Sequence, residues 1–99
     1  MWKTIPDDWV GKKGTEGGIV LRDEEYDSSC RVTLEKCPEY YAVTCGVYGS
    51  MVHTAFFDED EYEEKYEDMK QELQTFVDRM DDISDDDRSD FYASFCDRY

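Results

Sequence analysis

Apolar and polar residues alternate with a period of two through much of the first half of the chain. The alternation divides into four segments, which we expect to form strands at residues 18–26, 30–37, 39–47 and 50–57. Pro38 ends the second of them, because proline has no backbone N–H to donate to a β-ladder. The connections between the segments are short, so each is expected to pair with the next. The pattern therefore predicts a four-stranded antiparallel meander.

The last two strand segments are apolar on both faces rather than on one. In an antiparallel sheet, such double-sided apolarity indicates a central strand, a sheet face that is covered, or an interface with another molecule. If the turn between the two segments centres on residues 48–49, Cys45 lies opposite Val52, and His53 then points to the other face.

At Asp58 the spacing of the apolar residues changes from two to about 3.6. Asp58 followed by Glu61 fits a helix start, because a side-chain oxygen there can accept backbone N–H groups that have no partner within the first turn. One continuous apolar stripe then follows, and the opposite face is acidic. The stripe consists of Tyr62, Tyr66, Met69, Leu73, Phe76, Val77, Met80 and Ile83. This spacing predicts a long amphipathic helix.

A second, shorter helix is predicted at the C-terminus. The polar residues 84–90 interrupt the stripe, and Ser84 or Ser89 can cap a new helix. The residues that share its apolar face are Phe91, Tyr92, Phe95, Cys96 and Tyr99. Because each helix and the sheet have an apolar face to bury, we expect an α+β fold. In this fold both helices pack on one face of the four-stranded antiparallel sheet.

The 99 residues suit one domain, which we expect to span residues 1–99. Residues 1–18 are expected to form an irregular arm, because Pro6 and four glycines punctuate them. The first residues lack the apolar segment of a secretory signal, and no stretch approaches the roughly 18 apolar residues of a membrane-spanning helix. We therefore expect a cytoplasmic protein.

The net charge of the chain is more informative about its partners than any sequence motif. The chain has 26 acidic and 11 basic residues and a net charge of −15. Residues 1–57 contain nine acidic and six basic residues, whereas residues 58–99 contain seventeen acidic and five basic residues. A negative field of this size repels nucleic acids and anionic membranes and attracts basic proteins. We therefore expect a basic protein as partner, and neither a nucleic acid nor a membrane.

No motif in the chain predicts a catalytic, metal or cofactor site. The four cysteines, at positions 30, 37, 45 and 96, form no C-x-x-C pair, so we expect reduced thiols rather than zinc ligands or disulfides. Cys45 and His53 are the only candidates for a thiol nucleophile with its base, and the expected register separates them. The acidic residues near position 85 do not follow the calcium-loop pattern.

These observations leave three hypotheses of function. The first is a small acidic, non-enzymatic interaction protein, such as an inhibitor or immunity-type partner of a basic protein. Its binding residues would lie on the solvent side of the long helix and are Glu63, Glu64, Glu67, Asp68, Glu72 and Asp78.

The second hypothesis is a small-molecule-binding domain or enzyme with a tyrosine-rich pocket around His53. The third is a structural homodimer formed through an uncovered sheet face. The residues that would form either the pocket or the dimer face are Tyr40, Met51, His53 and Phe57.

Overall fold

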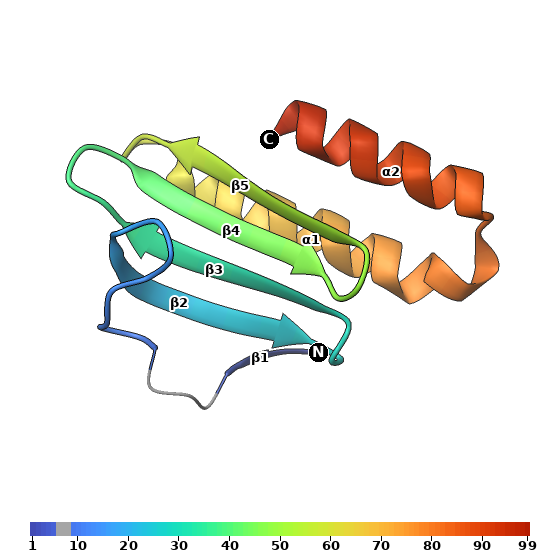
Figure 1. Cartoon of the computed structure of the whole chain (residues 1–99), viewed down its shortest axis with the longest axis horizontal. Helices are drawn as coiled ribbons and strands as arrows, with labels where there is room; N and C mark the ends of the chain where they lie inside the picture. Colours follow the sequence, from blue (N-terminus) through green and yellow to red (C-terminus); the bar gives the residue numbers. More distant parts are fainter. Residues whose placement is uncertain (6–8) are drawn as a thin grey trace.

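The computed structural model describes residues 1–5 and 9–99, and within these residues it contains five strands and two α-helices (Figure 1). The strands are β1 (Trp2–Thr4), β2 (Ile19–Tyr26), β3 (Cys30–Lys36), β4 (Tyr41–Val47) and β5 (Met51–Phe57). They are followed by α1 (Tyr62–Arg79), a 3₁₀ turn (Met80–Asp82) and α2 (Asp85–Arg98).

The strands form one antiparallel sheet in the order β1-β2-β3-β4-β5, so each strand pairs with its neighbour in the chain. The α+β class and the antiparallel sheet are thus confirmed, but the expected number of strands was one too few. The additional strand, β1, pairs Trp2 with Tyr26 inside the arm that was expected to be irregular. Three residues are too few to show an alternating pattern. Pro6 and the rest of residues 6–8 lie outside the described residues.

Side-chain hydrogen bonds lie at the start of both helices, but only α2 has a capping side chain at its N-cap residue. The Asp58 carboxylate accepts hydrogen bonds of 3.1 Å from the backbone N–H groups of Asp60 and Glu61 just before α1. Ser84 caps α2 by accepting a 3.1 Å hydrogen bond from the N–H of Asp87. The Ser84 contact supplies a partner to an N–H group that the first turn of α2 leaves without one, whereas the Asp58 contacts stabilise the turn that leads into α1.

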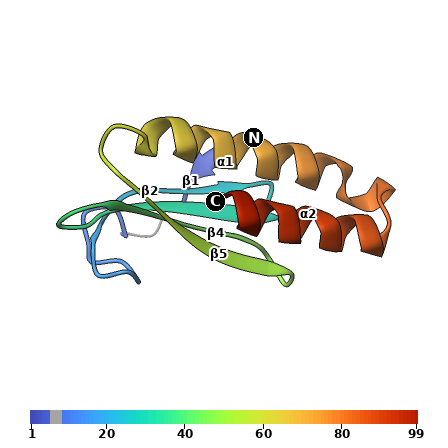
Figure 2. The same cartoon turned by 90° about the horizontal axis from the view of Figure 1, so that it is seen from above.

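The core lies between the sheet and the two helices. Figure 1 shows α1 running behind the sheet, and Figure 2 shows α2 beside α1 and close to β5. The apolar stripe predicted from the sequence faces the sheet, because Tyr66, Met69 and Leu73 are fully buried. The core residues of the sheet include Cys30, Val32, Leu34, Tyr41, Val43, Cys45, Val47, Ala55 and Phe57. The helices leave the other face of the sheet, called the open face below, uncovered (Figure 1).

An irregularity in β2 decides which of its residues reach the open face. Val20 pairs with Glu35, but Arg22 already pairs with Leu34, so Leu21 is an extra residue that forms a bulge. As a result Val20 and Asp23 share one face. An uninterrupted alternation along the strand predicted at residues 18–26 would place Val20 with Arg22, and the bulge makes that expectation wrong.

The turn between β4 and β5 sets a register that differs from the expected one. Val47 pairs with Met51 across a three-residue turn, in which Gly49 has a φ of +77°. A three-residue turn with a left-handed glycine is a common hairpin connection. It places Cys45 directly opposite His53 rather than opposite Val52. The two side chains therefore share one face of the sheet.

Candidate functional site

The six acidic residues predicted for partner binding lie on α1, and they differ in the contacts that they make with other residues of this chain. Glu63 and Glu67 each lie 3.6 Å from the guanidinium of Arg22. Glu72 forms a 2.5 Å ion pair with Arg98 and accepts a short hydrogen bond from the hydroxyl of Tyr99. These three carboxylates therefore also bind residues of this chain.

The remaining three acidic residues are all exposed. Asp78 accepts a 2.6 Å hydrogen bond from the hydroxyl of Tyr26. Within residues 1–5 and 9–99, Glu64 and Asp68 form no ion pair and no side-chain hydrogen bond. They are four residues apart and so lie on the same side of the helix. Glu64 and Asp68 are therefore the acidic side chains that α1 presents most directly to solvent.

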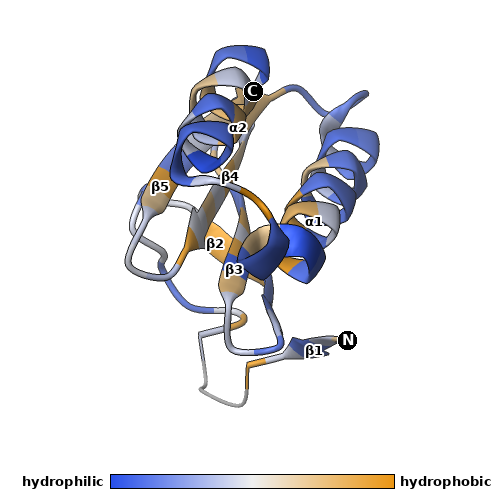
Figure 3. Ribbon diagram, turned by 90° about the vertical axis from the view of Figure 1, so that its right-hand side faces the viewer, coloured by the Kyte–Doolittle hydropathy of each residue, from blue (hydrophilic) through white to orange (hydrophobic). Residues whose placement is uncertain are grey.

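The basic residues of the helices do little to neutralise this surface. Lys70 is only 12% exposed and forms a 3.0 Å ion pair with Glu24 on β2. Arg88 donates two hydrogen bonds, of 2.6 and 3.1 Å, to the carbonyl oxygen of Met80. In Figure 3, hydrophilic residues dominate the outward sides of both helices. The outer surface of the helical layer is thus predominantly acidic.

The residues predicted for a pocket or dimer face do not lie on one surface. Met51, His53 and Phe57 are on the side of the sheet that the helices cover; Phe57 is 8% exposed, and the His53 ring lies 6.2 Å from the ring of Phe95 in α2. Tyr40 is exposed and contacts Phe56, with ring centroids 5.3 Å apart. The prediction that these four residues form one face is therefore corrected, because the helices cover the side to which three of them point.

The pairing of Cys45 with His53 raises the question of a thiol nucleophile. Burial raises the pKa of the Cys45 thiol to about 12, so the thiol stays protonated at neutral pH. Only the thiolate is nucleophilic, and a catalytic cysteine needs a lowered pKa. The pair is therefore better explained as part of the core than as a reactive site.

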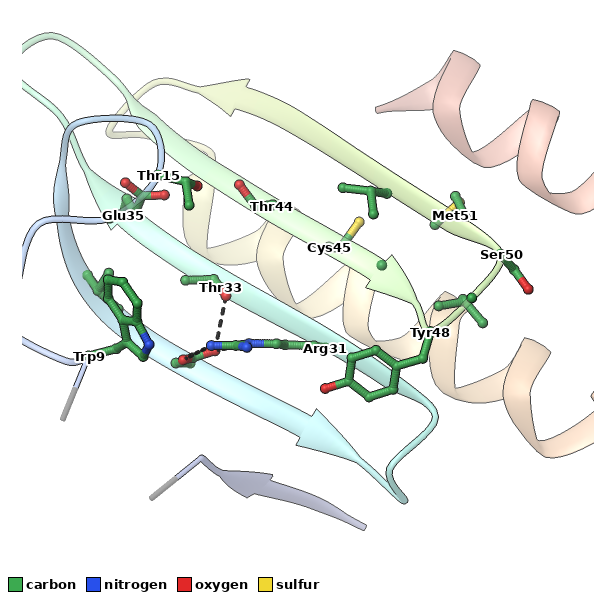
Figure 4. A pocket seen from close by; sticks show the side chains of 17 residues that line it. Trp9, Thr15, Arg31, Thr33, Glu35, Thr44, Cys45, Tyr48, Ser50 and Met51 are labelled. Atoms are coloured by element: carbon green, nitrogen blue, oxygen red, sulfur yellow. Dashed lines mark hydrogen bonds and ion pairs between the residues drawn. The ribbon is translucent and has the colours of Figure 1, made fainter. Parts of the chain in front are cut away.

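The open face contains a groove with a volume of about 600 Å³ (Figure 4). Small side chains form its floor, since Thr33, Thr44 and Gly46 leave space above β3 and β4. Larger residues flank it, and among them are Trp9, Tyr48 and Val52. Figure 4 shows Trp9, Thr15 and Glu35 at one end of the groove and Tyr48, Ser50 and Met51 at the other.

An ion pair with a buried carboxylate lies in this groove. Asp23 is 1% exposed and accepts hydrogen bonds of 2.8 and 2.5 Å from the Arg31 guanidinium and one of 3.0 Å from the Thr33 hydroxyl. Both carboxylate oxygens thus have donors, as a buried charge requires. At the far end, the Tyr48 hydroxyl donates a 2.5 Å hydrogen bond to Glu25. Partial burial and this hydrogen bond raise the pKa of Tyr48 to about 12.

Glu35 is the second buried carboxylate of the groove, and its side chain is fully buried. Its Oε1 accepts hydrogen bonds from the backbone N–H groups of Glu16 (3.1 Å) and Gly18 (3.3 Å) in the arm. Its Oε2 is also buried but has no hydrogen-bond partner within the described residues. A Cβ atom at Gly14 would lie 2.3 Å from the Glu35 carboxylate, so the arm can approach this closely only with glycine there.

The sequence analysis did not identify this groove. Alternation along the predicted strand at residues 30–37 places Glu35 on the face away from Cys30 and Leu34, but it does not indicate what covers that face. A usable signal was the group of glycines at positions 11, 14, 17 and 18, since repeated glycines indicate close approach between backbone and another group.

Comparisons with known proteins do not assign the groove or the acidic helix surface. The chain matches no known family model, and neither the curated proteins nor the solved structures include a significant match to it. Of the helices in residues 1–5 and 9–99, none has the length and apolar character needed to cross a bilayer. In the same residues, no three His, Cys, Asp or Glu side chains converge as metal ligands would.

Proposed function

We propose that this chain is a small, non-enzymatic binding protein that captures a basic protein partner, in the manner of an inhibitor or immunity-type protein. One observation carries the proposal: acidic residues dominate the exposed surface of the helical layer, while three of the five basic side chains there contact groups of this chain. Residues 58–99 contain seventeen acidic and five basic residues. Lys70, Arg88 and Arg98 all contact residues of the same chain.

Such a surface acts first on the rate of association. Exposed charges of one sign steer a partner of opposite charge toward the surface and increase the association rate constant, especially at low salt. Glu64 and Asp68 are best placed for this role, because they are exposed and have no ion pair within the described residues. Glu63 and Glu67 extend the same surface, and their 3.6 Å contacts with Arg22 are long enough to be exchanged for a partner's cation.

A binding role is also favoured over catalysis by the state of Cys45. Its thiol lies opposite His53, but burial raises its pKa to about 12. An enzyme that used this pair would need to lower that pKa instead.

The proposal is tested by capture followed by kinetics. Immobilised protein is exposed to a lysate of the source organism, and bound proteins are identified by mass spectrometry. We expect a basic protein, whose association rate constant is then measured at low and high salt for the wild type and for Glu64→Lys. Glu39→Lys is the matched control, because Glu39 is also exposed but lies in the turn before β4.

Glu64→Lys should slow association severalfold at low salt and much less at high salt. Glu39→Lys changes the net charge equally but should have a smaller effect. A captured partner that is acidic or neutral, or equal rates for the two variants, would contradict the proposal.

A further inference from the structure

We propose that the groove on the open face binds a small molecule in which a protonated amino group lies next to an aromatic ring. This is a second binding site, separate from the acidic surface of α1. It lies on the opposite side of the sheet from the helices (Figure 4).

The carboxylates of the groove select a cation. Asp23 and Glu35 are both buried, and both oxygens of Asp23 accept hydrogen bonds from the Arg31 guanidinium. Glu35 therefore remains the carboxylate with an unused acceptor, its Oε2. A buried acceptor without a donor costs free energy, and an ammonium group can supply up to three N–H donors together with a compensating charge. The net charge of −15 favours cations over anions in the same way.

The walls of the groove favour an aromatic ring beside that amino group. Trp9 is 42% exposed and lies at the same end of the groove as Glu35 (Figure 4). An exposed indole presents a face on which another ring can stack with centroids about 4.5–7 Å apart. The floor consists of the small residues Thr33, Thr44 and Gly46, which leave room for a planar group. A volume of about 600 Å³ also falls in the range, roughly 300–1,000 Å³, that is usual for small-molecule sites.

Access to Glu35 requires a small displacement of the arm, because Oε2 is itself buried. The arm uses only Oε1 of Glu35, through the N–H groups of Glu16 and Gly18. Glu35 lines the groove, so once the arm has shifted, an amino group that enters from the groove can bind Oε2 while Oε1 keeps its two hydrogen bonds. The arm would then form one wall of the occupied site, and the ligand would complete the hydrogen bonding of the carboxylate.

The test uses three probes with one ring and different head groups: 2-phenylethylamine, 2-phenylethanol and phenylacetate. Each is titrated into ¹⁵N-labelled protein, and the indole N–H signals of Trp9 and Trp2 are followed. Trp2 is an internal control, because its indole N–H donates to Gln74 on the helix side of the sheet. We expect the amine to shift the Trp9 signal and the amide signals of Glu16 and Gly18, while the alcohol and the acid have little effect.

Two variants then locate the amino group and the ring. Glu35→Gln keeps an oxygen for the N–H groups of Glu16 and Gly18 but removes the charge, so the affinity for the amine should fall about tenfold or more. Glu39→Gln removes the same charge from an exposed site outside the groove and should leave the affinity unchanged. Glu35→Gln could also weaken binding by loosening the arm, so Trp9→Ala provides an independent test. It removes only the ring on which the ligand stacks and should weaken binding severalfold.

The proposal is overturned if the alcohol or the acid binds as tightly as the amine, because the carboxylate then does not select the ligand. It is also overturned if the Trp9 signal does not move up to the solubility limit of the amine. Shifts confined to the second groove, between α1 and α2 near Gln71 and Phe91, would place the site elsewhere and equally refute it.

Discussion

Tyr66 of α1 donates a 2.6 Å hydrogen bond from its hydroxyl group to the carboxylate of Glu24 on β2. Lys70, one turn further along the helix, forms a 3.0 Å ion pair with the same carboxylate. Burial alone would raise the pKa of Glu24, but the hydrogen bonds from Tyr66 and Lys70 outweigh it and lower that pKa. A polar contact thus fixes α1 against β2 in addition to the apolar stripe.

We expect Tyr66→Phe to lower the free energy of unfolding by about 1.5–3 kcal/mol, because it removes a hydrogen bond to a charged acceptor at a buried position. Urea denaturation measures the change. Tyr92→Phe is the control, since the Tyr92 hydroxyl has no hydrogen bond within the described residues; its effect should stay within about 0.5 kcal/mol. Equal losses in the two variants would show that the ring, not the hydroxyl contact, stabilises α1.

The raised pKa values of two tyrosines lead us to expect that the protein unfolds at alkaline pH. A hydrogen bond to Asp78 and burial raise the pKa of Tyr26 to about 12 from the usual 10.0. Burial and the hydrogen bond to Glu25 raise the pKa of Tyr48 to about 12 as well. The folded state therefore keeps protons that the unfolded chain releases. The resulting stabilisation is complete below about pH 10 and is lost as the pH rises from 10 to 12.

Tyrosinate absorbance and circular dichroism, followed together against pH, measure this effect. We expect both transitions to coincide between pH 10 and pH 12, and to become less steep in Tyr26→Phe. The opposite result would be tyrosinate absorbance that develops around pH 10 for all eight tyrosines while the circular dichroism stays native.

Gly14 provides a test of how closely the arm approaches Glu35. In Gly14→Ala the added Cβ would lie 2.3 Å from the Glu35 carboxylate, so the arm or the side chain must move. We expect a loss of about 1–3 kcal/mol in the free energy of unfolding. The amides of Glu16 and Gly18 should also exchange faster with solvent. The adjacent Thr15→Ala, at an exposed position, should change neither quantity, and an unperturbed Gly14→Ala would refute the contact.

The thiols should differ sharply in reactivity. Cys30, Cys37 and Cys45 are buried, and burial raises the pKa of all three thiols, whereas Cys96 is partly exposed. A disulfide reagent added to the native protein should therefore react rapidly with Cys96 and slowly with the other three. After denaturation without a reductant, all four should react. Fewer than four would indicate disulfides and would contradict the expectation of reduced thiols.

The elements of this fold were predictable where the apolar pattern is long. The stripe from Tyr62 to Phe76 specified both α1 and its buried face, because a helix repeats the same face over many turns. The strand β1 was not predictable, since three residues carry no period. The bulge at Leu21 and the three-residue turn at Gly49 each shifted a register by one residue, and such a shift exchanges the two faces of a strand.

The candidate sites also differ in whether their residues are placed by the local sequence or by contacts with distant parts of the chain. Glu64 and Asp68 were placed on the solvent side correctly, because that follows from the helix alone. The burial of Glu35 depends on arm residues Glu16 and Gly18, which lie 19 and 17 positions earlier in the chain. No local pattern around Glu35 contains that contact, so only the tertiary structure identified the groove.

The neighbour-to-neighbour order of the strands has a consequence for how the chain folds. Each pairing from β2 to β5 closes a loop of a few residues, so the entropic cost of forming the hairpins is small and the sheet is expected to form quickly. During synthesis, however, the sheet is complete before α1 and α2 exist. Val32, Leu34 and Val43 are then exposed to water until α1 arrives, and this interval is when the nascent chain is most open to aggregation or to a chaperone.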